Sequence, residues 1–112
     1  MQIRNLTRKT LLSENAKICK SALSKFIGMM FSRPRALVFA FKEEKITSLH
    51  MLFVFYPIDV LFLDKSKKIV EIKENFMPFS FYRPKNKALY IIELPEGTIK
   101  KSKTGLGDKI GF

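Results

Sequence analysis

The stretch IDVLFLDKSKKIVEIK, residues 58–73, decides the fold. Its first six residues are almost all large and apolar, which is typical of a buried β-strand, and the polar run Asp64–Lys67 favours a turn. Lys68–Lys73 then alternates apolar and charged residues with the period of a half-exposed strand. The stretch therefore predicts a β-hairpin of Ile58–Leu63 and Lys68–Lys73 whose register places the lysines and glutamates outside.

Segments that favour β-structure continue on both sides of this hairpin. They are Ile3–Thr10, Ala16–Cys19, Leu37–Phe41, Thr47–Tyr56, Ala88–Leu94 and Lys109–Phe112. We interpret Lys42–Lys45 as a turn and Phe76–Arg83 as an ordered apolar loop. The fold class predicted is mainly β (α+β), a curved antiparallel sheet or small barrel of about seven strands with one short helix against it.

Two segments favour helical structure. Ser21 stands where a helix N-cap belongs, and the apolar residues of Ala22–Met30 recur at helical spacing before a proline at residue 34. Ile99–Thr104 could form one helical turn, which Gly105 would close. The first of these is the short helix that we expect against the sheet.

Length and composition favour one domain over residues 1–112. The chain has 112 residues, 46% of them hydrophobic, and its 11 Phe residues give a single core enough aromatic material. Cys19 is the only cysteine, so no disulfide can form within the chain. A lone thiol fits a reducing compartment.

The sequence favours a cytoplasmic location. The first residues lack the continuous apolar run of a secretory signal. The longest apolar region, Leu49–Leu63, is interrupted by a histidine, a proline and an aspartate, and it falls short of the roughly 20 residues that span a bilayer. We therefore expect no transmembrane segment.

The charge raises the question of a polyanionic partner. The 21 Lys and Arg residues outnumber the 10 Asp and Glu residues, which gives a formal net charge of +11. The aromatic residues of the 76–83 loop, next to cations, could form a platform for nucleic acid, or they could be a lid over the open end of the sheet. The candidate polyanion contacts are Arg4, Arg8, Lys9, Arg83, Lys85 and Lys87, although solvated charge alone would explain them.

No residue pattern demands a particular chemistry. A carboxylate within the apolar strand, Asp59, needs a partner, and Arg33 could hold it through two hydrogen bonds. The catalytic alternative, a hydrolase or transferase, would use Asp59 as a base, with Glu93 as a second carboxylate. One histidine, His50, and one cysteine cannot form the usual zinc sites. We therefore assign no catalytic residue, metal or cofactor.

Three motifs carry a resemblance to a known family. Gly28–Arg33 looks like the motif "GLM-x-R", Pro57–Asp64 looks like "PLDILFLD", and Glu93–Gly97 looks like "LELPAG". In this order and spacing they resemble the domain of unknown function family DUF192, from about residue 15 to the C-terminus. The sequence departs from the family at 49–54, where LHMLFV replaces "FWMKNT" and removes its Trp, Lys and Asn.

The resemblance implies a small, mainly β domain with a short helix, and it implies no established activity, substrate or cofactor. The first hypothesis is a non-catalytic domain that binds a partner or ligand at a surface lined by the family motifs. The candidate binding residues are Met29, Arg33, Met51, Asp59 and Glu93. The second hypothesis is polyanion binding by the basic and aromatic residues, and the third is the hydrolase or transferase.

Overall fold

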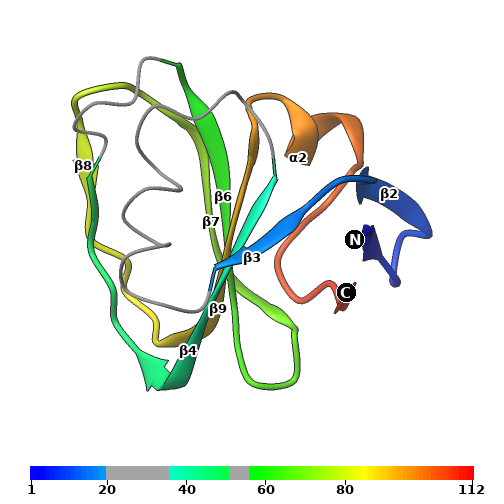
Figure 1. The fold of residues 1–112 in the computed structure, drawn as a ribbon, viewed down its shortest axis with the longest axis horizontal. Helices are drawn as coiled ribbons and strands as arrows, with labels where there is room; N and C mark the ends of the chain where they lie inside the picture. The colour runs from blue at the N-terminus through cyan, green and yellow to red at the C-terminus, as the bar shows by residue number, and fades with distance from the viewer. Residues whose placement is uncertain (20–35, 51–55) are drawn as a thin grey trace.

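A computed structural model describes residues 1–19, 36–50 and 56–112. These residues form three sheets, and Figure 1 shows the largest in the middle, with the two termini to one side and β8 to the other. The elements are β1 (Ile3–Asn5), β2 (Thr10–Ser13), β3 (Lys17–Cys19), β4 (Leu37–Lys45), β5 (Leu49–His50), β6 (Ile58–Leu63), β7 (Ile69–Phe76), β8 (Phe81–Tyr82), β9 (Ala88–Pro95), α2 (Thr98–Lys101) and β10 (Ile110–Gly111).

Most neighbouring strands in the sheets pair antiparallel. The five-stranded sheet has the order β3-β4-β9-β6-β7, and only its β3–β4 pair is parallel. A three-stranded sheet, β10-β1-β2, joins the two ends of the chain, and β5 pairs with β8. The mainly β prediction is confirmed, with curved sheets and one short helix among the described residues.

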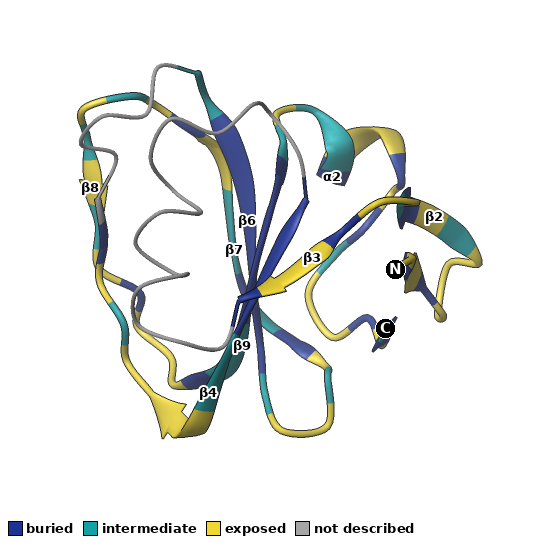
Figure 2. Cartoon of the chain, viewed as in Figure 1, coloured by how far each residue is buried: buried dark blue, intermediate teal, exposed yellow. Residues whose placement is uncertain are grey.

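The hairpin predicted from residues 58–73 is present. β6 and β7 pair antiparallel, and the Oδ1 atom of Asp64 accepts the backbone N–H groups of Ser66 and Lys68 at 2.9 and 3.0 Å, which shapes the turn. β6 lies between β9 and β7 and is buried along its whole length, as is visible in Figure 2. A strand covered on both faces needs the continuous apolar run that this sequence has.

The two faces of the central sheet build two separate cores. On one face, residues such as Val38, Leu61 and Ile92 pack with the N-terminal strands and α2. On the other, Phe39, Phe62 and neighbours pack with β5 and β8. Because partners in an antiparallel pair share a face, the strand register tells which core each side chain of β6 and β9 enters.

Several predicted boundaries differ from the structure. Lys42–Lys45 is not a turn but the exposed end of β4, where charged side chains can stay in water on an extended strand. Ile3–Thr10 divides into β1, a turn and the first residue of β2, and Phe76–Arg83 contains the short strand β8. Within 47–56 the described strand is Leu49–His50, and the predicted helix Ala22–Met30 lies outside the described residues.

The helical turn near the C-terminus ends differently from the prediction. α2 covers Thr98–Lys101, and Lys103, not Gly105, adopts the left-handed conformation that ends it, at φ 58°. The N–H of Lys103 donates to the carbonyl of Lys100, and the N–H of Thr104 donates to the carbonyl of Ile99. This pair of hydrogen bonds forms a Schellman motif, in which glycine is the usual residue at the Lys103 position.

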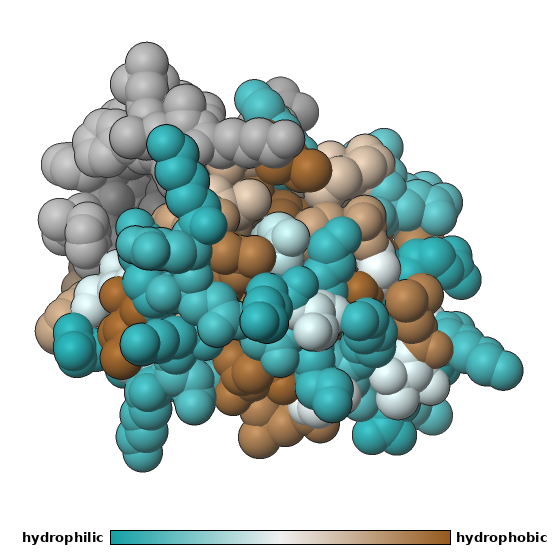
Figure 3. Space-filling model, turned by 90° about the horizontal axis from the view of Figure 1, so that it is seen from below, coloured by the Kyte–Doolittle hydropathy of each residue, from teal (hydrophilic) through white to brown (hydrophobic). Residues whose placement is uncertain are grey.

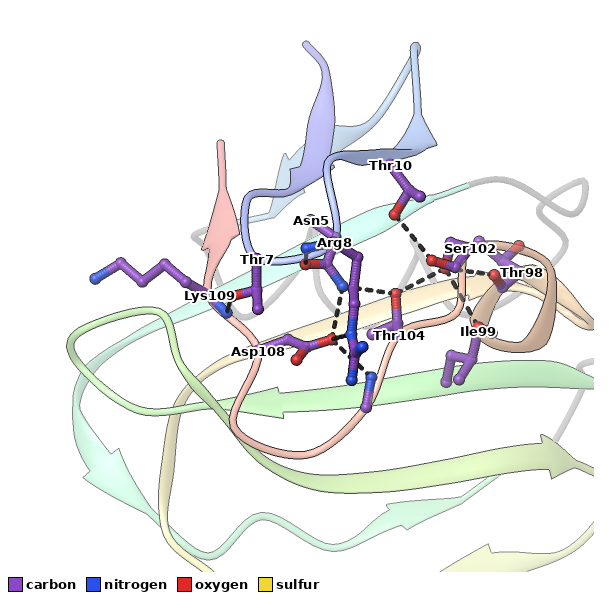
Figure 4. A network of polar contacts seen from close by, with 11 residues as sticks. Asn5, Thr7, Arg8, Thr10, Thr98, Ile99, Ser102, Thr104, Asp108 and Lys109 are labelled. Carbon is purple, nitrogen blue, oxygen red and sulfur yellow. Dashed lines mark hydrogen bonds and ion pairs between the residues drawn. The ribbon is translucent and has the colours of Figure 1, made fainter.

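A buried polar network fastens the two ends of the chain together (Figure 4). The Nδ2 atom of Asn5 donates to Thr104 Oγ1 at 3.0 Å and to Asp108 Oδ2 at 2.9 Å. Burial would raise the pKa of Asp108, but hydrogen bonds from Asn5, the Gly105 amide and Arg8 lower it overall. Asn5 therefore links β1 to the C-terminal loop through partners about a hundred residues away.

The variant Asn5→Ala should lower the free energy of unfolding by about 2 kcal/mol, because it removes the buried amide that donates to both Asp108 and Thr104. The matched control is Asn15→Ala at an exposed position, which should change it by less than about 0.5 kcal/mol. Urea denaturation measures both. Equal effects of the two variants would contradict the structural role of the network.

The variant Lys103→Gly should raise the free energy of unfolding by about 0.5 kcal/mol, because glycine adopts a positive φ without strain. Lys101→Gly removes the same charge from a helical position two residues earlier and should lower it by about 1 kcal/mol. Thermal denaturation compares the two variants. A destabilised Lys103→Gly protein would show that the left-handed turn is absent.

Candidate functional site

Asp59 is buried in β6, with only 2% of its surface exposed. Its Oδ1 atom accepts the backbone N–H of Asn75 at 3.0 Å, and its Oδ2 atom accepts those of Gly97 and Ile99, also at 3.0 Å. Gly97 is the N-cap of α2, so the carboxylate supplies the negative charge that the first turn of the helix lacks. Three hydrogen bonds offset the cost of burying this carboxylate.

These bonds determine what Asp59 can do. Both of its oxygens hold the backbone at the end of β7 and at the start of α2. The predicted partner, Arg33, lies outside the described residues, as do Met29 and Met51. A surface hollow of about 270 Å³ borders Asp59, Glu74, Glu96 and Lys100, and its acids and lysine point to no particular ligand.

Glu93 lies on the opposite face of the sheet from Asp59. In the β6–β9 register Glu93 is opposite Val60, whereas Asp59 is opposite Leu94, and neighbouring pairs point to opposite faces. Val60 belongs to the core beneath β5 and β8, and Leu94 belongs to the core beneath α2. The two carboxylates therefore do not converge, and the geometry that a shared acid–base pair requires is absent between them.

The Glu93 carboxyl is buried, with 5% of the residue exposed, and its Oε2 atom has no hydrogen-bond partner in the described part of the chain. Burial raises the pKa of this carboxyl to about 8. Glu93 is therefore protonated at neutral pH.

Glu71 is a buried carboxylate that the sequence analysis placed outside. Tyr82 donates its hydroxyl to Glu71 Oε2, and the backbone N–H groups of Lys85 and Asn86 donate to Oε1 at 2.8 and 2.9 Å. Burial alone would raise the pKa of Glu71, but these hydrogen bonds, led by that of Tyr82, lower it. The same hydrogen bond raises the pKa of Tyr82 to about 12.

A β-bulge explains the misplaced Glu71. The β6–β7 register shifts between Phe62 and Leu63, which leaves Val70 as an extra residue and turns Glu71 to the same face as Val70. Simple alternation would place Glu71 with Ile69, on the other face. The alternation of apolar and charged residues in the sequence does not reveal the extra residue.

The loop between β7 and β9 exposes two aromatic rings. Phe79 is 65% exposed and Phe81 is 71% exposed, whereas Phe76 is buried. Tyr82 lies against the core, with its ring centre 6.0 Å from that of Phe62 and 6.4 Å from that of Phe76. The lid interpretation therefore fits Phe76 and Tyr82 but is wrong for Phe79 and Phe81.

Cations follow these rings directly. Arg83, Lys85 and Lys87 are all exposed, and no acid occurs between Met77 and Ile92. We call Phe79, Phe81, Arg83, Lys85 and Lys87 the aromatic–basic surface.

The N-terminal cations lie elsewhere. Figure 1 shows the N-terminus and β8 at opposite ends of the longest axis, so Arg4, Arg8 and Lys9 do not extend the aromatic–basic surface. Arg8 also pairs with Asp108, with its Nε atom 3.3 Å from Oδ2. In the face shown in Figure 3 hydrophilic side chains surround small apolar patches.

The family model of DUF192, described as an uncharacterized ACR, matches residues 4–112. The chain belongs to the DUF192 family. The match spans nearly all of the chain and confirms the family suggested by the three sequence motifs.

Curated relatives of this DUF192 protein are named UPF0127 proteins. One from Thermococcus sibiricus is 38% identical, over 96% of this chain and 72% of its own length. One from Pyrococcus furiosus is 34% identical, over 95% of this chain and 93% of its own length. One from Pyrococcus horikoshii is 40% identical, over 84% of this chain and 84% of its own length. Their names give no activity.

Two solved structures share the fold. A Sinorhizobium meliloti protein, provisionally named a transcription regulator, matches with a TM-score of 0.88 at 23% identity, over 98% of this chain and 91% of its own. A Novosphingobium aromaticivorans protein of unknown function matches with a TM-score of 0.85 at 14% identity, over 99% of this chain and 82% of its own. At these identities the likeness shows the fold alone.

The described residues of the DUF192 protein show two absences. Among them, no group of three His, Cys, Asp or Glu side chains is arranged to hold a metal ion. None of the helices found in these ranges has the length and apolar character to cross a bilayer.

The buried Glu93 should make stability depend on pH. Its pKa is about 8 in the fold against 4.5 for an ordinary glutamate, so the folded state holds an extra proton between these values. The free energy of unfolding should therefore fall, on the order of a few kcal/mol, as the pH rises from about 5 to about 8. Glu93→Gln should remove most of this fall, as urea denaturation at several pH values would measure.

The control is Glu74→Gln at an exposed position of β7, which should leave the pH dependence unchanged. If Glu93→Gln and the unmodified protein lose stability in parallel as the pH rises, the carboxyl is not the group that titrates.

Proposed function

We propose that this DUF192 protein is a non-catalytic binding domain, and that it binds a polyanion at the aromatic–basic surface. The observation that carries the proposal is the exposure of Phe79 and Phe81, 65% and 71%, directly beside three exposed cations. Large exposed aromatic side chains within one loop are typical of binding sites. The cations next to them determine the charge of the ligand.

The charges of the whole protein support the same ligand class. A net charge of +11 on 112 residues produces a long-range field that concentrates polyanions near the surface. Glu71, in β7, is the carboxylate that contacts the loop, and it is turned inward, where its oxygens accept hydrogen bonds from Tyr82 and the 85–86 backbone. The cations of the loop are therefore not neutralised by that carboxylate.

The other two hypotheses receive less support from the described residues. Asp59 has both oxygens engaged by backbone amides, which favours a structural role over ligand binding through the family motifs. Asp59 and Glu93 point to opposite faces of the sheet, which disfavours a hydrolase or transferase built on the two. We therefore base the proposal on the loop.

Binding of fluorescent inorganic polyphosphate, followed by anisotropy at about 50 and about 200 mM salt, tests this function. The protein should bind at low salt and lose affinity steeply at high salt. Replacing Arg83, Lys85 and Lys87 by Gln should weaken binding about tenfold or more, because three phosphate contacts are lost. No binding at low salt would contradict the proposal.

The matched control replaces by Gln three cations outside the loop between β7 and β9, namely Arg4 in β1, Lys9 in the turn before β2 and Lys17 in β3. These residues are exposed, and the net charge changes by the same amount. The control should lose affinity by no more than about threefold, through the weaker long-range field. Equal losses in the two triple variants would show that net charge, and not this surface, binds the polyanion.

A further inference from the structure

We infer that the polyanion is single-stranded nucleic acid, whose bases stack on Phe79 and Phe81 while its phosphates contact Arg83, Lys85 and Lys87. This inference rests on the proposed function and adds the class of ligand. Cations alone would bind any polyanion. The rings therefore indicate which class of polyanion binds. Exposed aromatic rings and a basic segment next to them are the two elements of a surface that binds single strands.

The backbone at Phe79 is held in an unusual conformation. Its φ is 61°, in the left-handed region that a bulky side chain rarely adopts. The Oγ atom of Ser80 donates to the carbonyl of Met77 at 2.5 Å and closes the turn around Phe79. Strain of this kind persists where the surrounding structure fixes it, and it gathers at ligand-binding positions.

The exposure of Phe81 follows from strand register. β8 pairs with β5 so that Tyr82 is opposite Leu49, and both side chains enter the core. Neighbouring residues of a strand point to opposite faces, so Phe81 must point outward. A shift of the β5–β8 register by one residue would bury Phe81 and expose Tyr82, whose hydroxyl donates to Glu71.

The cations are presented on a fixed backbone as well. Glu71 accepts the N–H groups of Lys85 and Asn86, so the segment after the rings is fastened to β7. The exposed Arg83, Lys85 and Lys87 recur at every second residue, and Pro84 between the first two is buried. Rings and cations therefore meet a ligand with little loss of backbone freedom.

The rings discriminate between polyanions. An unpaired base offers a flat face on which a phenyl ring can stack, whereas duplex bases are already stacked inside the helix. Polyphosphate and an anionic lipid headgroup have no such face. The surface should therefore prefer single strands to duplex DNA and to polyphosphate of similar length.

Fluorescence anisotropy with oligo-dT and oligo-rU of about 20 nucleotides, a duplex of the same length and polyphosphate tests the inference. Single strands should bind about tenfold tighter than the other two. The double variant Phe79→Leu, Phe81→Leu keeps apolar side chains but removes the rings. It should weaken single-strand binding at least about tenfold and change polyphosphate binding by less than about twofold.

The double variant Phe79→Tyr, Phe81→Tyr keeps both ring faces and should bind single strands within about threefold of the unmodified protein. Because both rings are largely exposed, thermal denaturation should give all variants the same midpoint. Tyrosine variants that lose affinity as the leucine variants do would overturn the stacking.

Four other results would also overturn the inference, and they can be told apart. Unchanged single-strand affinity in the leucine variants, or duplex and polyphosphate binding as tight as single-strand binding, would remove the stacking but leave the polyanion proposal intact. No binding to any of these probes would remove both. Ring-dependent binding to phosphatidylserine vesicles, tighter than to oligonucleotides, would assign the surface to a membrane instead.

Discussion

The carboxylate of Asp59 accepts hydrogen bonds from three backbone amides that lie 16, 38 and 40 residues further along the chain. Because β6 is covered on both faces, this charge would be costly without them. The bonds hold the end of β7 and the first turn of α2 at fixed positions against the central strand. One buried side chain thus connects the end of β7 and the first turn of α2 to the central strand.

A second carboxylate continues this arrangement. Asp59 holds Asn75, whose φ of 49° lies at the register shift near the end of β7, and Glu71 holds Tyr82, Lys85 and Asn86, which follow the exposed rings in sequence. The loop with the aromatic–basic surface therefore has a fixed start and a fixed end. Buried carboxylates such as Asp59 and Glu71 are the residues that one would first consider as catalytic groups. Here they accept hydrogen bonds from backbone and hydroxyl donors instead. A surface held in this way can bind a ligand without first becoming ordered.

The sequence alone predicted the parts that follow from regular patterns. The apolar run of β6, the Asp64 turn and the antiparallel β7 were all correct, because burial on two faces and turn chemistry leave clear local signals. The left-handed Lys103 was not predicted, since Gly105 nearby offered the usual signal for ending a helix. Lys42–Lys45 resembled a turn because an exposed strand end and a turn have the same polar composition.

The candidate site was harder to predict, because its features depend on long-range pairing. The need of Asp59 for a partner was visible in the sequence, but the Asn75, Gly97 and Ile99 amides could not be, since they come from segments distant in sequence. The inward turn of Glu71 depends on a bulge without a sequence signal.

Two buried carboxylates hold the loop with the aromatic–basic surface at both ends. Amide hydrogen exchange followed by NMR tests this most directly. The amides of Asn75, Lys85 and Asn86 should exchange far more slowly than an unstructured chain, although Lys85 and Asn86 lie on an exposed segment. In a Glu71→Ala variant, Lys85 and Asn86 should lose this protection while Asn75 keeps it. Exchange of all three amides at unstructured rates in the unmodified protein would contradict the account.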